Sequence, residues 1–201
     1  MFSRCRLATP PSAALLAAAL GAAGPAFADM ISSEGMAPYE VCGLCHGLDG
    51  DSAMAKFPKL AGQRAAYVEK QLDDFRAGRR LDDGGQMQAI VSELAPADIP
   101  IVAAWFESQP PPEPAVAGDP QGAALFEDLQ CGGCHGGTAP AGLTVPHIAA
   151  QHAPYIERQL RAFRGGGRDN DPDGVMRRVA KDLTDAQIAQ LAAHVSSLPR
   201  R

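Results

Sequence analysis

A five-residue stretch able to hold an iron porphyrin covalently occurs twice in the chain. It is CGLCH at residues 42–46 and CGGCH at residues 131–135. Two cysteines separated by two residues and followed at once by histidine have the spacing for haem attachment: the thiols form thioethers to the vinyl groups, and the imidazole is the proximal iron ligand. One such stretch is also compatible with a zinc half-site or a redox dithiol, but two in a repeated sequence predict two haems. The predicted attachment cysteines and proximal histidines are Cys42, Cys45, His46, Cys131, Cys134 and His135.

The first 28 residues are predicted to be a cleaved signal peptide. Basic residues precede an apolar run from Ala13 to Ala23, and Ala26-Phe27-Ala28 forms an A-x-A cleavage site. A membrane anchor is the alternative, but the apolar run is shorter than the roughly 20 residues that a membrane-spanning helix needs. Cleavage would also remove Cys5, which leaves the four haem cysteines alone. We therefore expect the mature protein in a bacterial periplasm.

The mature sequence contains a tandem repeat. The segment PKLAGQ at 58–63 returns as PHIAAQ at 146–151, and QLDDFRAGRR returns as QLRAFRGGGR at the same offset of 88 residues. Between the two copies lies a proline-rich segment, which would be extended and fairly stiff. The alternative is a surface loop within one domain. We predict a signal peptide over 1–28, a first haem domain over 29–109, a linker over 110–120 and a second haem domain over 121–201.

Each half is predicted to contain three helices. The first helix is expected to begin near Ser33 in one half and near Gln121 in the other, and to lead into the haem motif. Apolar residues with i, i+4, i+7 spacing predict the second helix, around 68–75 and 156–163.

The third helix carries apolar positions at 99–106 and 188–195. In the second half it opens with Thr184 and Gln187 in capping-box spacing. In the first half Pro100 lies near the start, so an irregular beginning is expected there. No segment alternates as a strand would, and each half is therefore predicted to be all-α.

The ligand opposite each histidine would decide what the irons can do. Met87 and Met176 correspond between the halves, and each lies 41 residues after its own haem histidine. Methionine is more often core filler, but the matched separation predicts two thioether ligands and hence low-spin, closed irons. Met54 has no counterpart and is expected only to pack. The remaining histidines are His147, His152 and His194, and surface or structural roles are expected for them. The alternative is a bis-histidine second haem that uses His147 as a ligand.

Other residues at equivalent positions are candidates for contacts around the haems. Pro58 and Pro146 precede the second helix, and a carbonyl at each position could accept a hydrogen bond from the proximal imidazole. The alternative is an ordinary loop proline. Donors to haem propionates are predicted at four positions, with simple solvation as the alternative: Tyr67, Tyr155, Arg80 and Arg168.

Charge is distributed unevenly along the mature chain. Residues 29–111 hold 13 acidic and 7 basic side chains, whereas residues 112–201 hold 10 and 9. Such asymmetry can orient a protein as it approaches a charged partner; the alternative is an acidic face that keeps the protein soluble. An acidic balance disfavours nucleic acid as a partner.

With both motifs, both methionines and the blocks FPKLAGQ, QLDDFRAGRR and MQAIVSEL, the sequence resembles the cytochrome c4 family of periplasmic dihaem cytochromes. The resemblance implies two tandem class I cytochrome c-like domains, each wrapped around one haem c, in a non-enzymatic electron carrier. It implies redox partners such as a terminal oxidase, a cytochrome bc1-type complex or a periplasmic dehydrogenase, with peripheral association with membrane complexes as a further option. The second half departs from the family pattern at PHIAAQ and MRRVAKDL, which leaves the partner contacts of its haem open.

Two other functions compete with a soluble carrier. One is a tightly bound dihaem subunit of a dehydrogenase, such as the flavocytochrome c sulfide dehydrogenase kind. The other is a catalytic dihaem protein such as a peroxidase, which requires one accessible iron. The presence of Met87 and Met176 in corresponding positions disfavours the second alternative.

Overall fold

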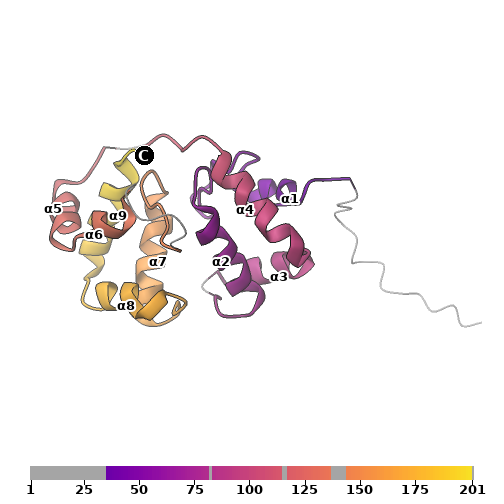
Figure 1. Cartoon of the computed structure of the whole chain (residues 1–201). Helices are drawn as coiled ribbons and strands as arrows, with labels where there is room; N and C mark the ends of the chain where they lie inside the picture. The colour runs from indigo at the N-terminus through magenta and orange to yellow at the C-terminus, as the bar shows by residue number, and fades with distance from the viewer. Residues whose placement is uncertain (1–34, 82, 115–116, 137–143, 201) are drawn as a thin grey trace, which may run out of the picture. The chain divides into compact units, whose positions relative to one another are not determined.

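The computed structural model describes residues 35–81, 83–114, 117–136 and 144–200, and every regular element within them is helical (Figure 1). The all-α prediction is confirmed. The predicted signal peptide lies outside the described residues. No single helix among those described is long and apolar enough to cross a bilayer, although the bent pair Gln86–Glu93 and Pro96–Ser108 meets both criteria together.

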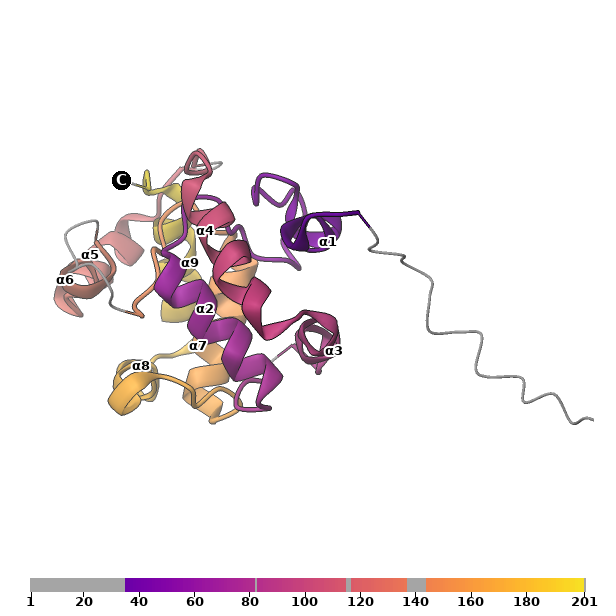
Figure 2. The same ribbon diagram turned by 45° about the vertical axis from the view of Figure 1, so that its right-hand side comes forward.

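The first repeat, residues 35–109, is built on the predicted apolar stripe of its second helix. That helix, α2, packs against the third and fourth helices, and α1 packs against α4 (Figure 2). Val68, Leu72 and Phe75 of α2 are buried, as is Phe106 of α4. The elements are α1 (Pro38–His46), α2 (Ala65–Arg76), α3 (Gln86–Glu93), the 3-10 turn η1 (Pro96–Asp98) and α4 (Ile99–Ser108).

The second repeat, residues 120–200, follows the same plan. Helix α9 packs against α5 and α7, and α7 packs against α8. Its predicted apolar positions are buried in α9, and Ile156 and Phe163 of α7 are buried with them. The elements are α5 (Pro120–Asp128), α6 (Cys131–His135), α7 (Ala153–Gly165), η2 (Pro172–Gly174), α8 (Val175–Ala180) and α9 (Asp185–Ser197).

The starts of α4 and α9 differ as the sequence predicts. Thr184 caps α9, because its hydroxyl accepts a hydrogen bond from the Gln187 amide at 3.2 Å. The Gln187 side-chain oxygen in turn accepts from the Thr184 amide at 2.9 Å. In contrast, a 3-10 turn precedes α4, and Pro100 lies in the first turn of α4. A proline there removes no helical hydrogen bond, because first-turn amides have no partner within the helix.

The prediction of three helices in each half is wrong. Two additional helices, α3 and α8, carry Met87 and Met176. They have eight and six residues, too few to show a clear apolar period in the sequence. In the second repeat, Gln130 has φ 54° and separates the haem motif into a helix of its own. Helix α1 begins at Pro38, later than predicted; Ser33 itself lies outside the described residues.

The crossing of α5 and α9 requires a glycine. A Cβ atom added to Gly122 would lie 2.0 Å from the Gln190 carbonyl oxygen and 2.9 Å from His194 Cβ. The two helix backbones therefore approach too closely for any side chain at this position.

We predict that Gly122→Ala destabilises the holoprotein by about 1–3 kcal/mol or more, because α5 must move away from α9. The denaturant midpoint measures this. The control is Gly165→Ala, since a Cβ there meets nothing within 4 Å and alanine favours a helix by up to about 1 kcal/mol. Equal stability of Gly122→Ala and the wild type would contradict the packing described.

Candidate functional site

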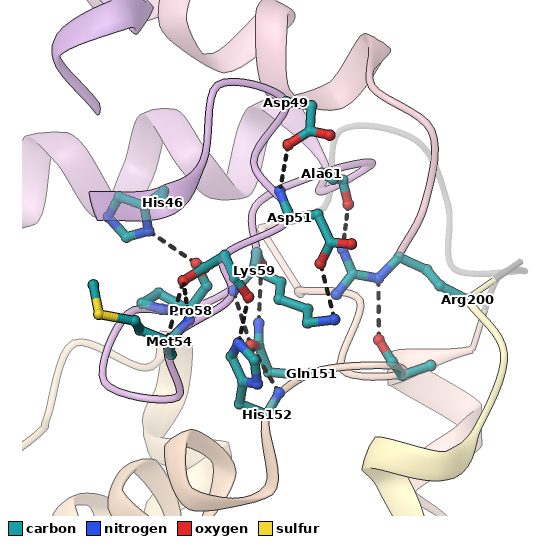
Figure 3. Close-up of polar contacts among 12 residues, drawn as sticks. His46, Asp49, Asp51, Met54, Pro58, Lys59, Ala61, Gln151, His152 and Arg200 are labelled. Atoms are coloured by element: carbon teal, nitrogen blue, oxygen red, sulfur yellow. Dashed lines mark hydrogen bonds and ion pairs between the residues drawn. The ribbon is translucent and has the colours of Figure 1, made fainter. Parts of the chain in front are cut away.

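Both motif histidines are oriented by a proline carbonyl. The Nδ1–H of His46 donates to the Pro58 oxygen at 2.8 Å, and that of His135 donates to the Pro146 oxygen at 2.9 Å (Figure 3 shows the first pair). A carbonyl can only accept, so the proton is on Nδ1 and the Nε2 lone pair is free. The predicted acceptor role of Pro58 and Pro146 is confirmed, and each imidazole has the tautomer that an iron ligand needs.

The protonation state of these groups suits haem attachment. Burial lowers the pKa of His46 and of His135, against the opposing effect of the bonds to their prolines, so both imidazoles are neutral at pH 7. Burial also raises the pKa of the Cys42 thiol to about 11 and raises that of Cys131. Neutral imidazoles beside half-buried thiols are compatible with haem attachment.

One cavity is lined by the motif residues of both repeats. It has a volume of about 870 Å³ and a mainly apolar lining that includes the four cysteines and both motif histidines. Met87 and Met176 also line it. Ligand cavities are typically apolar with a few polar groups of fixed position. Thiol pairs, neutral imidazoles and thioethers around such a space fit haem c.

An aspartate fixes the start of each methionine-bearing helix. The Asp83 carboxylate accepts from the Met87 amide at 2.6 Å, and Asp171 accepts from the Arg177 amide at 3.1 Å. These two aspartates occupy equivalent positions of the repeat. Capping of this kind stabilises the first turn of a helix, and here it positions the residue that carries the thioether.

The repeats contact each other through a reciprocal pair of glutamines. The Gln151 side chain accepts from the Lys59 amide and donates to the Lys59 carbonyl, both at 2.9 Å (Figure 3). Gln63 does the same with His147, at 2.8 and 2.9 Å. These four residues belong to the repeated PKLAGQ and PHIAAQ blocks, so the sequence pattern that marks the repeat also holds its two copies together.

A second reciprocal contact involves two arginines that line the cavity. Arg80 stacks on Phe75 of its own repeat and donates to Tyr155 Oη of the other repeat at 3.1 Å. Arg168 stacks on Phe163 and donates to Tyr67 Oη at 3.2 Å. Both guanidinium groups also donate to the same two buried amide oxygens, those of Gln71 and Gln159. The assignment of these tyrosines and arginines to haem propionates stays a prediction.

The three histidines outside the motifs have separate surroundings. The Nε2–H of His152 donates to the Ser52 carbonyl at 2.8 Å, and His194 packs edge-on against Phe126 with 5.4 Å between ring centroids. The structural roles predicted for these two are confirmed. His147 lines the cavity, and burial together with the nearby Arg64 charge lowers its pKa to about 4.

Several residues that position the two sites were not identified as such from the sequence. Gln63 and Gln71 recur as Gln151 and Gln159, and this recurrence could have indicated a shared structural role. The same is true of Asp83, which recurs as Asp171.

Asp74 of the first repeat has contacts that no pattern revealed. Its buried carboxylate accepts from Lys70, from Arg79 Nε at 2.8 Å and from Asn170 Nδ2 of the second repeat at 2.6 Å. Burial by itself raises the pKa of Asp74, but these hydrogen bonds outweigh it, and the pKa lies below its ordinary value. The second repeat has Ala162 at the equivalent position, so this contact has no counterpart.

Comparison with known proteins gives one consistent picture. The cytochrome c family model matches residues 120–199. Cytochrome c4 from Pseudomonas aeruginosa is 38% identical over 196 residues, which cover 89% of this chain and 94% of that protein. The thiosulfate dehydrogenase electron acceptor of Stutzerimonas stutzeri is 36% identical and covers 80% of each chain. Reduced cytochrome c4 from Pseudomonas stutzeri has a TM-score of 0.68 at 36% identity, over 79% of this chain and 93% of that structure.

An all-helical repeat with an attachment motif in each copy defines a c-type cytochrome with two covalently bound haems. The cytochromes c4 that this chain resembles are electron-transfer proteins and not enzymes, and the same holds for this chain. The extent of the similarity shows that the chain belongs to the cytochrome c4 family. The resemblance, the fold class and the haem c cofactor predicted from the sequence are thereby confirmed.

The contacts of Asp74 make stability depend on pH. Because the folded pKa is below the unfolded value of about 3.9, ionised Asp74 stabilises the fold above that value, and this contribution is lost as the pH falls through the folded pKa. We predict that Asp74→Asn costs about 1–3 kcal/mol at pH 7 and flattens the loss of stability in acid. Denaturant titrations from pH 7 to 3 test this. The control is Asp73→Asn, because Asp73 is the neighbouring carboxylate and is exposed. Parallel curves for Asp74→Asn and the wild type would contradict it.

Proposed function

We propose that this cytochrome is a periplasmic electron carrier with two low-spin, six-coordinate haems. Each repeat attaches one haem through its two cysteines and supplies a proximal histidine and a distal methionine. The haem couples supply the one-electron chemistry. The proposed attachment residues and iron ligands are Cys42, Cys45, His46 and Met87 in the first repeat and Cys131, Cys134, His135 and Met176 in the second.

The observation that carries this proposal is the equivalence of the two sites. In both repeats a buried or half-buried imidazole is neutral, donates from Nδ1 to a proline and leaves Nε2 free. In both, a methionine at the same sequence separation lines the same cavity from an aspartate-capped helix. A thioether ligand closes the iron to small molecules and raises its potential, so neither repeat is arranged for catalysis at an open iron.

We further propose the domain limits expected from the sequence: 1–28 as signal peptide, 29–109 and 121–201 as haem domains, and 110–120 as linker. Helix α4 ends at Ser108 and α5 begins at Pro120, and the described residues between them have no helix. Each repeat contains its own core clusters. Secretion of the chain to the periplasm follows from the predicted leader.

Partner docking is supported best at the first haem. Leu44, inside the first motif, is 63% exposed, and Leu48 is 66% exposed. Leu48 Cδ2 would lie 2.8 Å from a Cβ on Gly43, so the Leu48 side chain lies against the first motif. The second motif has Gly133 in place of Leu44. Exposed apolar surface of this kind is typical of an interaction site, and we propose that a respiratory complex or dehydrogenase contacts the carrier there.

A second candidate function is that of a dehydrogenase's bound electron acceptor. The similar protein from Stutzerimonas stutzeri is named as an electron acceptor of thiosulfate dehydrogenase. The same sites would then receive electrons within a stable complex. Size-exclusion chromatography of the native protein distinguishes the candidates, since the carrier elutes alone and the subunit elutes with a second polypeptide.

We predict that Met87→Ala and Met176→Ala each open one iron and leave the other unchanged. The altered haem should bind carbon monoxide, lose its sulfur-to-iron charge-transfer absorption and fall in potential by about 0.1 V or more, within the roughly 0.8 V range that axial ligands span. Redox titration with optical spectra measures all three effects.

The matched control is Met54→Leu. Met54 is 53% exposed, so the packing role expected from the sequence is wrong, and it has no counterpart in the second repeat. This variant should retain two closed haems and both potentials. The ligand assignment is wrong for a repeat whose methionine variant keeps the wild-type spectrum and potential.

A further inference from the structure

Arg64 extends from the first repeat to the segment that holds the second motif histidine. It is the N-cap residue of α2. Its Nη1 donates to the Val145 carbonyl at 2.8 Å, and its Nη2 donates to the Gly136 carbonyl at 3.1 Å. Gly136 directly follows His135, and Val145 directly precedes Pro146. One guanidinium group therefore binds both ends of the segment between the imidazole and the carbonyl that orients it.

The charge of Arg64 also lies beside this histidine, because its two bonds end on the residue that follows His135 and on the residue that precedes Pro146. Arg64 is half-buried, and none of the ion pairs found among the described residues includes it. The nearby Glu107 carboxylate accepts from the Ala65 amide instead, at 2.9 Å. A charge in this setting is screened less than one at an open surface.

Among the described residues, no half-buried arginine donates to the carbonyls that flank His46 and Pro58. The position of Arg64 is taken in the second repeat by His152, which donates from Nε2 to the Ser52 carbonyl (Figure 3). Arg158 also extends from the second repeat, to the Lys56 carbonyl at 2.7 Å, but it is solvent-exposed. The cation beside the first motif is the exposed Lys56, which lies over the Phe57 ring at 5.2 Å from its centroid, and Phe57 packs edge-on against His46. The two histidines therefore differ in the type and the burial of the neighbouring cation.

We propose that Arg64 is a positioning residue of the second haem, supplied by the first repeat, and that its charge raises the reduction potential of that haem alone. Oxidised haem carries one more positive charge than reduced haem, so a fixed cation nearby favours the reduced form. Arg64 would thus separate the two potentials of a duplicated protein through a contact across the repeat boundary. The inference rests on the proposed function in one respect, that His135 is an iron ligand.

The test compares Arg64→Gln, Arg64→Lys and the control Arg161→Gln in the holoprotein. Arg161 lies in the second repeat, is 43% exposed and pairs with Glu157, so this control makes the same change in net charge away from the motif. Redox titration gives both potentials, and the Met176→Ala spectrum identifies the second haem. In Arg64→Gln the equilibrium of the second haem should shift about tenfold toward oxidation, about 59 mV for a one-electron couple. Arg64→Lys should retain most of the wild-type potential.

Three results would overturn the inference: an unchanged second potential in Arg64→Gln, an equal fall at both haems, or an equal fall in Arg161→Gln. A fall in Arg64→Lys as large as in Arg64→Gln would also reject a role for the charge. Failure of the proposed function is recognised separately, because the wild-type protein would then lack two low-spin haems. Arg64→Lys keeps the test available where Arg64→Gln does not fold.

Discussion

The bond from each motif imidazole to a proline carbonyl is the interaction on which both sites depend. It fixes the proton on Nδ1 of His46 and His135, sets the ring orientation and leaves Nε2 toward the cavity. Burial reinforces it by keeping both rings neutral. The covalent thioethers would hold the haem, but the iron can be bound only by an imidazole in this tautomer. In both repeats the proline that accepts this bond lies between the haem motif and the next helix, α2 or α7.

The contacts between the repeats are of two kinds. The reciprocal bonds of Gln63 and Gln151 are the same in both directions, and they keep the two copies in a fixed register. The contacts of Arg64 and of Asp74 with Asn170 have no charged counterpart, because His152 and Ala162 take the equivalent positions in the second repeat. We infer that unequal charges at equivalent positions give the two similar motifs different potentials.

Much of this structure could be predicted from the sequence because its main features are local. The haem motifs, the helical stripes and the capping box of Thr184 each depend on residues a few positions apart, and the structure has all three elements in place. Helices α3 and α8 were missed because short helices owe their stability to tertiary packing rather than to their own periodicity. Arg64 and Asp74 were missed because their partners in the second repeat lie 72 or more residues away and their counterparts in that repeat differ.

The central claim is that two irons are each closed by a histidine and a methionine. The most direct test is a redox titration of the wild-type holoprotein, followed by optical and electron-spin spectra and repeated under carbon monoxide. The account predicts two one-electron transitions, low-spin signals from both irons and no effect of carbon monoxide. A high-spin iron, a single transition from one haem, or carbon monoxide binding at neutral pH would contradict it.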